Sequence, residues 1–241
     1  MAFRLYCRTP FGRLHRGNRE IIELSRKIGR TPSALAMKAC NFASLDPEQR
    51  KRKITALANA SRADRDLWKR FEQNPEEVVS EAEEAYARIA GRDVIAAEIE
   101  FEAPGGPSEV ARVIRARRLQ GFFRDAVLVS YENRCALSGI ALADLLNASH
   151  IIPWSKDIHR RADPRNGIAL NVLYDRAFDR GLITFDSSLR VVVSRRLRKE
   201  PIAPLQLQAL LQLEGRTLRS PVRFAPDPEA LEYHREHVFR D

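Results

Sequence analysis

The sequence predicts an α+β protein in which a helical N-terminal module, with the outline of a helix-turn-helix, precedes a C-terminal domain of short strands and helices. Apolar residues of the first part recur at helical spacing, whereas the second part has a strand, a loop and a helix in succession around His150. A Pro- and Gly-rich stretch at 103–108 separates them. We therefore expect a helical module at 1–75, an acidic helix and linker at 76–108, and a second domain at 109–241.

The first predicted pair of helices surrounds a glycine. Gly29 ends the first helix, and Thr31 with Pro32 starts the second as N-cap and first helical residue. The apolar positions at helical spacing are Ile21, Ile22, Leu24 and Ile28 in the first helix, and Leu35, Ala36, Ala39, Cys40 and Phe42 in the second, which Asp46-Pro47 ends. This outline is that of a DNA-binding helix-turn-helix, with Arg30 and Lys38 as candidate contacts. A helical hairpin without DNA contacts is the alternative.

Two further helices are expected before the linker. The first, around Arg62 to Phe71, would contribute Trp68 and Phe71 to a core. The second, from Pro75 to Gly91, is acidic, and we interpret it as a solvated spacer that could alternatively mask basic surface.

Charge is distributed unevenly along the chain. The 241 residues include 41 Lys and Arg and 32 Asp and Glu, a net charge of +9. Residues 1–70 carry +11, residues 71–110 carry −9, and residues 111–241 carry +7. Two basic parts around an acidic connector favour a polyanionic partner such as double-stranded DNA, and a solvated basic surface is the alternative.

Several classes of protein are excluded by composition. No stretch approaches the roughly 20 apolar residues that a membrane span needs, and the first residues lack the apolar core of a signal peptide. The 3 cysteines are too widely spaced for a disulfide framework or a zinc knuckle. We expect a cytoplasmic protein with no membrane partner.

The residues that could carry chemistry begin in Ala148-Ser-His-Ile-Ile-Pro-Trp154. A strand there would hold the His150 imidazole rigidly, and a neutral histidine can accept a proton from water near pH 7. Asn166 follows 16 residues later, and Asp175 and Asp179 share one helical face at i,i+4 spacing. Hard oxygen ligands of this kind suit Mg²⁺, or Mn²⁺ as the alternative.

Together with Asn166-Gly167 and Phe178-Asp-Arg-Gly-Leu-Ile183, this motif resembles the HNH endonuclease family, over roughly residues 110–240. The resemblance implies a ββα-metal nuclease fold with His150 as general base and a divalent metal held by Asn166 and Asp175. The helical face shared with Asp175 makes Asp179 a further candidate ligand, although Asp179 could alternatively only cap the end of that helix before Gly181. Asn166 would bind the metal or hold the His-bearing loop. It also implies DNA hydrolysis to 5′-phosphate and 3′-hydroxyl ends, and a restriction or defence role.

The chain departs from the family pattern at two places. Asp175 stands where many relatives carry His, although the neighbouring Tyr174 could be the aligned position instead, and Ser149 stands where many carry Asp or His. These departures leave open a second hypothesis, a non-catalytic DNA-binding protein or regulator that retains a degenerate HNH scaffold. Ser138 cannot replace a thiolate beside Cys135, so no structural zinc is expected.

Arginines surround the predicted site and are suited to bidentate phosphate contacts. The candidates are Arg124, Arg160, Arg161, Arg165 and Arg176.

One site of this kind cuts one strand, so we also expect a homodimer, built on the acidic helix and the leucine-rich stretch 204–238. Those leucines could alternatively cap the nuclease core.

Overall fold

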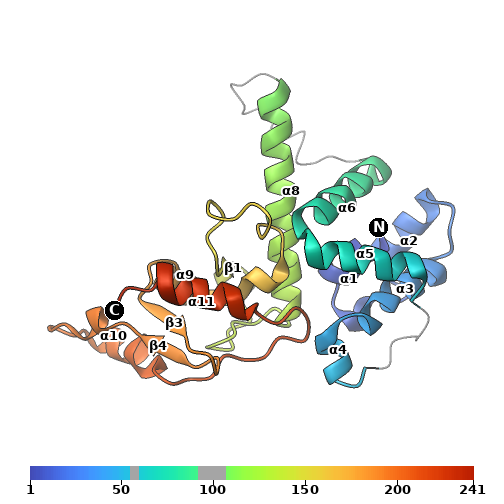
Figure 1. Ribbon diagram of the computed structural model, residues 1–241. Helices are drawn as coiled ribbons and strands as arrows, with labels where there is room; N and C mark the ends of the chain where they lie inside the picture. Colours follow the sequence, from blue (N-terminus) through green and yellow to red (C-terminus); the bar gives the residue numbers. More distant parts are fainter. Residues whose placement is uncertain (55–59, 92–106) are drawn as a thin grey trace.

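The computed structural model describes residues 1–54, 60–91 and 107–241. Helices and short antiparallel strands occur together, which confirms the predicted α+β class. The N-terminal helices lie on one side of the long helix α8 (Pro107–Ser130), and the strands lie on the other (Figure 1). The α-helices are α1 (Ala2–Arg8), α2 (Arg19–Lys27), α3 (Pro32–Asn41), α4 (Pro47–Lys51), α5 (Arg62–Gln73), α6 (Pro75–Ala90), α8, α9 (Val172–Asp179), α10 (Pro204–Ala209) and α11 (Pro228–His237).

The strands pair in two small sheets. β1 (Leu146–His150) pairs with β2 (Gly167–Asn171), and β3 (Ile183–Phe185) pairs with β4 (Val191–Val193). Short 3₁₀ turns occur at η1 (Phe11–Arg13), η2 (Phe42–Ser44), η3 (Ala143–Leu145), η4 (Pro164–Asn166), η5 (Arg195–Arg198) and η6 (Leu211–Leu213). No helix in the described ranges combines the length and apolar character that a bilayer crossing requires.

The predicted helix, glycine turn and helix are present at the predicted places. The Asn18 side chain accepts hydrogen bonds from the N–H groups at the start of α2, and the Thr31 side chain does the same at α3, where Pro32 is the first residue. Between them, Gly29 has a φ of +64°, which a residue with a Cβ adopts only with strain. Local capping and turn chemistry therefore fixes this pair.

Asp46 and Pro47 begin a helix, whereas the sequence analysis assigned them to the end of one. α3 already ends at Asn41, and the Asp46 carboxylate accepts the N–H of Glu48 at the start of α4. The same carboxylate accepts a hydrogen bond of 2.6 Å from the buried Tyr6 hydroxyl. An Asp-Pro pair is a start signal as well as a stop signal, and here the start signal determines the structure.

The acidic helix α6 has the expected bounds and ends at Gly91, which has a φ of +65°. It packs in the N-terminal core instead of standing apart as a spacer, because Val78 and Val79 are buried there. Glu83, also buried, accepts hydrogen bonds from Arg4 at 2.8 Å and Arg8 at 3.0 Å. A buried carboxylate needs such partners, so α6 is fixed against α1.

Helix α8 contributes to both hydrophobic cores. Phe122 and Ala126 belong to the N-terminal core, whereas the next residues, Phe123 and Val127, belong to the C-terminal one. Residues 103–106 of the predicted boundary lie outside the described residues. The division at 1–75, 76–108 and 109–241 therefore stays a prediction.

A C-terminal segment also inserts into the N-terminal core. Phe224 stacks on Trp68 with ring centroids 6.1 Å apart, and the buried Arg223 guanidinium donates to the backbone carbonyls of Tyr6 and Thr9. The Gln49 amide donates to the Val222 carbonyl at 2.6 Å. The segment 222–224 is thus packed against the N-terminal helices.

The ββα unit is formed by β1, β2 and α9. β1 and β2 are antiparallel, with Leu146 opposite Asn171 and His150 opposite Gly167. Gly167 is required because a Cβ there would lie 2.4 Å from Val127 and 2.7 Å from Phe123. This close approach of β2 to α8 places the end of β1 against Phe123.

Candidate active site

His150 lies at the end of β1, half-buried against α8. The Phe123 ring is stacked on the imidazole with centroids 3.7 Å apart and planes 10° apart. The His150 Nε2 lies 3.1 Å from the Arg161 carbonyl oxygen. A carbonyl can only accept, so Nε2 carries the proton and Nδ1 keeps its lone pair. The imidazole is therefore fixed as the tautomer with Nδ1 as an acceptor.

Burial lowers the pKa of His150 to about 4, although the Arg161 carbonyl and the charge of Asp175 oppose the shift. Desolvation disfavours the imidazolium, so the ring is neutral at pH 7. A neutral imidazole with a free nitrogen can take a proton from water, and the nearby Asp175 carboxylate would stabilise the positive charge that forms.

The Asp175 carboxylate is held at both oxygens by side chains of β1. Ser149 Oγ donates to Oδ1 at 2.5 Å, and Asn147 Nδ2 donates to Oδ2 at 2.7 Å. Asn171 positions α9 by accepting the N–H groups of Leu173 and Tyr174. Ser149, one of the two departures from the pattern noted in the sequence, thus has a structural role as a hydrogen-bond donor to Asp175.

A cavity of about 320 Å³ brings these groups together. His150 and Asp175 lie in its wall, so the structure brings together two of the residues that the sequence predicted. Its lining residues are Gln120, Phe123, Arg124, Asn147, Ala148, His150, Trp154 and Asp175. Asp179 is exposed and is not among them. Partial desolvation of its carboxyl group, followed by the charge of Asp175, raises the pKa of Asp179.

Asn166 is buried at the end of the loop that connects β1 to β2 and is not among the residues that line the cavity. Its Oδ1 accepts the Ile152 N–H at 2.8 Å, and its Nδ2 donates to the carbonyls of Ile152 at 3.1 Å and Arg160 at 3.3 Å. The side chain is 1 % exposed. Of the two roles considered for Asn166, these contacts favour holding the loop.

The donor set suits a hard cation that retains much of its water shell. Among the described residues, no group of three or more His, Cys, Asp and Glu side chains could hold a metal. Asp175 supplies one fixed carboxylate at the cavity, beside the amide of Asn147. Mg²⁺ is commonly bound through one or two carboxylates, with waters and substrate phosphate completing its shell. The residues present therefore fit Mg²⁺ or Mn²⁺ better than a metal that needs three protein ligands.

The candidate phosphate-binding arginines differ in their surroundings. Arg124 lines the cavity and Arg176 is exposed on α9. Arg160 pairs with Asp227 and Glu229, and Arg165 pairs with Asp163 at 2.9 Å. Arg161 donates to the Trp154 carbonyl at 2.8 Å. Part of the basic cluster is thus engaged in holding the loop between β1 and β2.

The two candidates in the N-terminal module also differ. Arg30 is exposed in the turn between α2 and α3. The Lys38 ammonium is held by Asp64 at 2.8 Å and by Ser61 at 3.0 Å. Arg30 is therefore the more available of the two for a phosphate.

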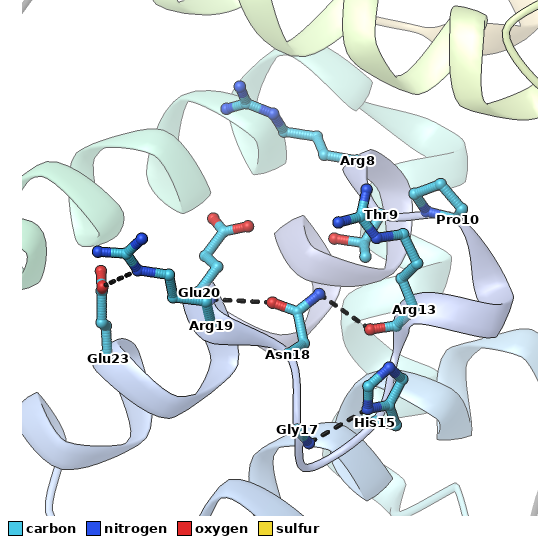
Figure 2. Close-up of a pocket in the computed structure, with 10 residues that line it drawn as sticks. All are labelled: Arg8, Thr9, Pro10, Arg13, His15, Gly17, Asn18, Arg19, Glu20 and Glu23. Atoms are coloured by element: carbon cyan, nitrogen blue, oxygen red, sulfur yellow. Dashed lines mark hydrogen bonds and ion pairs between the residues drawn. The ribbon is translucent and has the colours of Figure 1, made fainter.

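A larger cavity, of about 770 Å³, lies at the start of α2, in the N-terminal module (Figure 2). Arg8, Arg13 and Arg19 line it, together with Glu20 and Glu23. Arg8 is paired with Glu83 and Asp125, and Arg19 is paired with Glu23. This pairing of cations with carboxylates makes the wall mixed in charge, and the cavity contains none of the predicted catalytic residues.

Several residues at or beside the cavity that contains His150 were not predicted as site residues from the sequence. Asn147 and Ser149 alternate along β1 and therefore face the same side, a polar pattern that could have indicated a shared partner. Gln120, Phe123 and Trp154 carry no such local signal, because α8 and the loop reach the cavity only through tertiary packing.

Comparison with known proteins gives one family. Residues 135–186 match the family model described as HNH endonuclease. The matched segment contains β1, β2 and α9, and therefore His150, Asn166 and Asp175. No curated protein matches the chain.

Proposed function

We propose that this protein is a metal-dependent endonuclease that hydrolyses phosphodiester bonds of double-stranded DNA, which the match of residues 135–186 to the HNH endonuclease model supports. The observation that carries the proposal is the pairing, in one cavity, of an imidazole with a free Nδ1 and a carboxylate fixed at both oxygens. Such a pair suits the activation of water beside a bound phosphate.

His150 acts as the general base. Its Nδ1 takes a proton from a water molecule, and the resulting hydroxide attacks phosphorus. Phe123 and the Arg161 carbonyl hold the ring in the cavity wall with Nδ1 as its acceptor nitrogen, while Asp175 stabilises the imidazolium. Arg124, which lines the cavity, orients a phosphate oxygen.

A divalent cation bound at Asp175, Mg²⁺ or Mn²⁺, would supply stabilisation of the charge that develops on the phosphate and on the departing 3′-oxygen. Asn166 supports this arrangement from behind by keeping the loop from Ile151 to Arg165 in place. Asp179 lies one turn further along α9 and would contact the cation directly or through one of its bound waters. The products are 5′-phosphate and 3′-hydroxyl ends.

The basic N-terminal module contributes affinity for the duplex. Residues 1–70 carry a net charge of +11, and neutralised phosphates release counterions. A nuclease that binds duplex DNA in this way fits a restriction or defence role, and a homodimer would place two sites across the two strands.

The experiment is incubation of the purified protein with supercoiled plasmid and Mg²⁺ or Mn²⁺. We expect nicked and linear products from the wild type and none from His150→Ala, because the water then lacks its base. His159→Ala is the matched control, since His159 is exposed in the same loop region, and it should cleave at the wild-type rate. Wild-type protein that binds the plasmid without cutting it would instead be a non-catalytic DNA-binding protein.

A further inference from the structure

Several large apolar side chains are exposed next to the catalytic cavity. Leu142 is 64 % exposed, Leu145 is 39 % exposed and Val172 is 46 % exposed. We call these three residues the apolar rim. Exposed apolar residues are ordinary when they are scattered, but a contiguous group indicates a contact surface.

The ββα unit brings the three residues of the apolar rim together. Leu146 is opposite Asn171 in the β1–β2 ladder, so the preceding Leu145 and the following Val172 lie at the same end of it. The Leu145 N–H donates to the Leu142 carbonyl at 3.0 Å. This turn keeps Leu142 close to Leu145, at the same end of the ladder. The rim is therefore one surface, although it is formed by two segments of the chain.

The apolar rim borders the catalytic cavity. Val172 and Asp175 are three residues apart on α9 and so share a face of that helix. On the other segment, the Ala143 carbonyl accepts a hydrogen bond of 3.4 Å from Arg124, which lines the cavity. A molecule bound with its phosphate at Asp175 would therefore meet the rim.

The charged side chains around the apolar rim indicate which class of molecule binds there. The exposed cations Arg124 and Arg176 lie beside it and can contact phosphate, and they outnumber the one exposed carboxylate within the rim segment 142–145, that of Asp144. A duplex offers phosphates at its edge and stacked apolar bases between them, which matches cations around apolar side chains. Proteins that enter the minor groove commonly insert leucine or similar side chains between base pairs, and the duplex bends there.

We propose that the apolar rim inserts between base pairs of duplex DNA beside the scissile phosphate, with Leu142 as the leading side chain. Insertion unstacks the neighbouring bases and bends the duplex, which presents the phosphate to His150 and Asp175. This inference rests on the proposed nuclease function and adds to it a contact with the bases.

The test uses a duplex whose cleavage position has been mapped with the wild-type protein, with 2-aminopurine placed next to that position. Binding is measured with Mg²⁺ in the His150→Ala background, so that the duplex stays intact. We expect 2-aminopurine fluorescence to rise on binding, because the base becomes unstacked. Leu142→Ser should remove this rise and weaken binding by about tenfold, the loss expected when a leucine side chain no longer leaves water.

Three comparisons distinguish insertion from a general effect. Ile158→Ser is the matched control, because Ile158 is 52 % exposed in the loop between β1 and β2 and does not line the cavity, and it should leave fluorescence and affinity unchanged. Leu142→Met should retain both signals, since it keeps an apolar side chain of similar volume. Leu142→Ser should leave the log–log salt slope unchanged, whereas Arg176→Gln should reduce it by about 0.9.

The outcomes separate this inference from the proposed function. If the wild type cleaves DNA but Leu142→Ser binds with unchanged affinity and fluorescence, insertion is refuted and the nuclease assignment stands. If the wild type neither cleaves nor binds duplex DNA, both fail. If light scattering shows that Leu142→Ser converts a dimer into a monomer while the fluorescence signal persists, the rim is an interface between copies of the chain, and insertion is again refuted.

Discussion

The role of Asn166 can be decided by a single isosteric substitution, Asn166→Asp. The amide has two kinds of contact: its Oδ1 accepts from the Ile152 N–H, and its Nδ2 donates to the carbonyls of Ile152 and Arg160. Aspartate keeps the acceptor but replaces the donor with a carboxylate oxygen that faces two carbonyl oxygens. A metal ligand would gain charge from this change, whereas a residue that holds the loop would lose its bonds.

The expected loss follows from those contacts. Each lost hydrogen bond costs about 1 kcal/mol, and leaving buried acceptors without a donor costs about 1–3 kcal/mol more. Because the side chain is 1 % exposed, water cannot replace the donor. We expect the free energy of unfolding to fall by about 3 kcal/mol at pH 7, which corresponds to a decrease in Tm of about 6–12 °C for a chain of this size.

The assays are urea unfolding followed by circular dichroism, and Mn²⁺ binding followed by calorimetry. Asn133→Asp is the matched control, because Asn133 is exposed and undergoes the same chemical change, so its stability should stay within about 0.5 kcal/mol of the wild type. If Asn166→Asp unfolds at the same urea concentration as the wild type and binds Mn²⁺ more tightly, the loop-holding role is wrong and Asn166 is a metal ligand.

Four further predictions concern the site, stability, binding and assembly. Asp175→Ala should abolish Mn²⁺ binding measured by calorimetry, whereas Asp175→His should retain binding with a changed metal preference. Asp144→Ala, which removes an exposed carboxylate, should bind Mn²⁺ as the wild type does. Mn²⁺ binding by Asp175→Ala would refute this site. Burial lowers the pKa of His234 to about 4 from 6.5, so the folded state binds fewer protons than the unfolded state between these pH values. The contribution of neutral His234 to the free energy of unfolding is therefore fully present above about pH 6.5. This contribution, about 3 kcal/mol, is lost as the pH falls from about 6.5 to 4, and His234→Leu should flatten the pH dependence of the urea midpoint; an equally steep dependence in that variant would contradict it. Duplex binding should weaken with a log–log salt slope of about −4 or steeper, and a salt-independent interaction would indicate a protein partner instead. Light scattering should give twice the 27.5 kDa chain mass, and a mass of one chain with and without DNA would exclude the homodimer.

Helix positions in the N-terminal module followed from local residues. Thr31 and Gly29 act on N–H groups and dihedral angles within a few residues of themselves, so their effect is visible in sequence. The packing of α6 was not predictable in this way. Its place in the core depends on Arg4 and Arg8, which are more than 70 residues away and give the buried Glu83 its partners.

In the candidate site, too, some features were predictable from the sequence and others depended on tertiary contacts. The motif predicted His150 and Asp175 as chemical groups, and the strand, loop and helix that carry them. It did not predict which imidazole nitrogen is free, because the Arg161 carbonyl determines this and its position depends on the folded loop. Asn166 likewise had two roles open until its buried contacts were known.

The sequence by itself determined the α+β class, the similarity of residues 135–186 to the HNH endonuclease model and the residue types able to move a proton or bind a hard cation. Only the tertiary structure decided which basic side chains form ion pairs within the protein and which line the cavity. Arg160 is engaged by Asp227 and Glu229, far along the chain, whereas Arg124 reaches the cavity from α8. The physical reason is that a buried or half-buried charge takes whatever partner packing brings to it, and such partners have no fixed spacing in sequence.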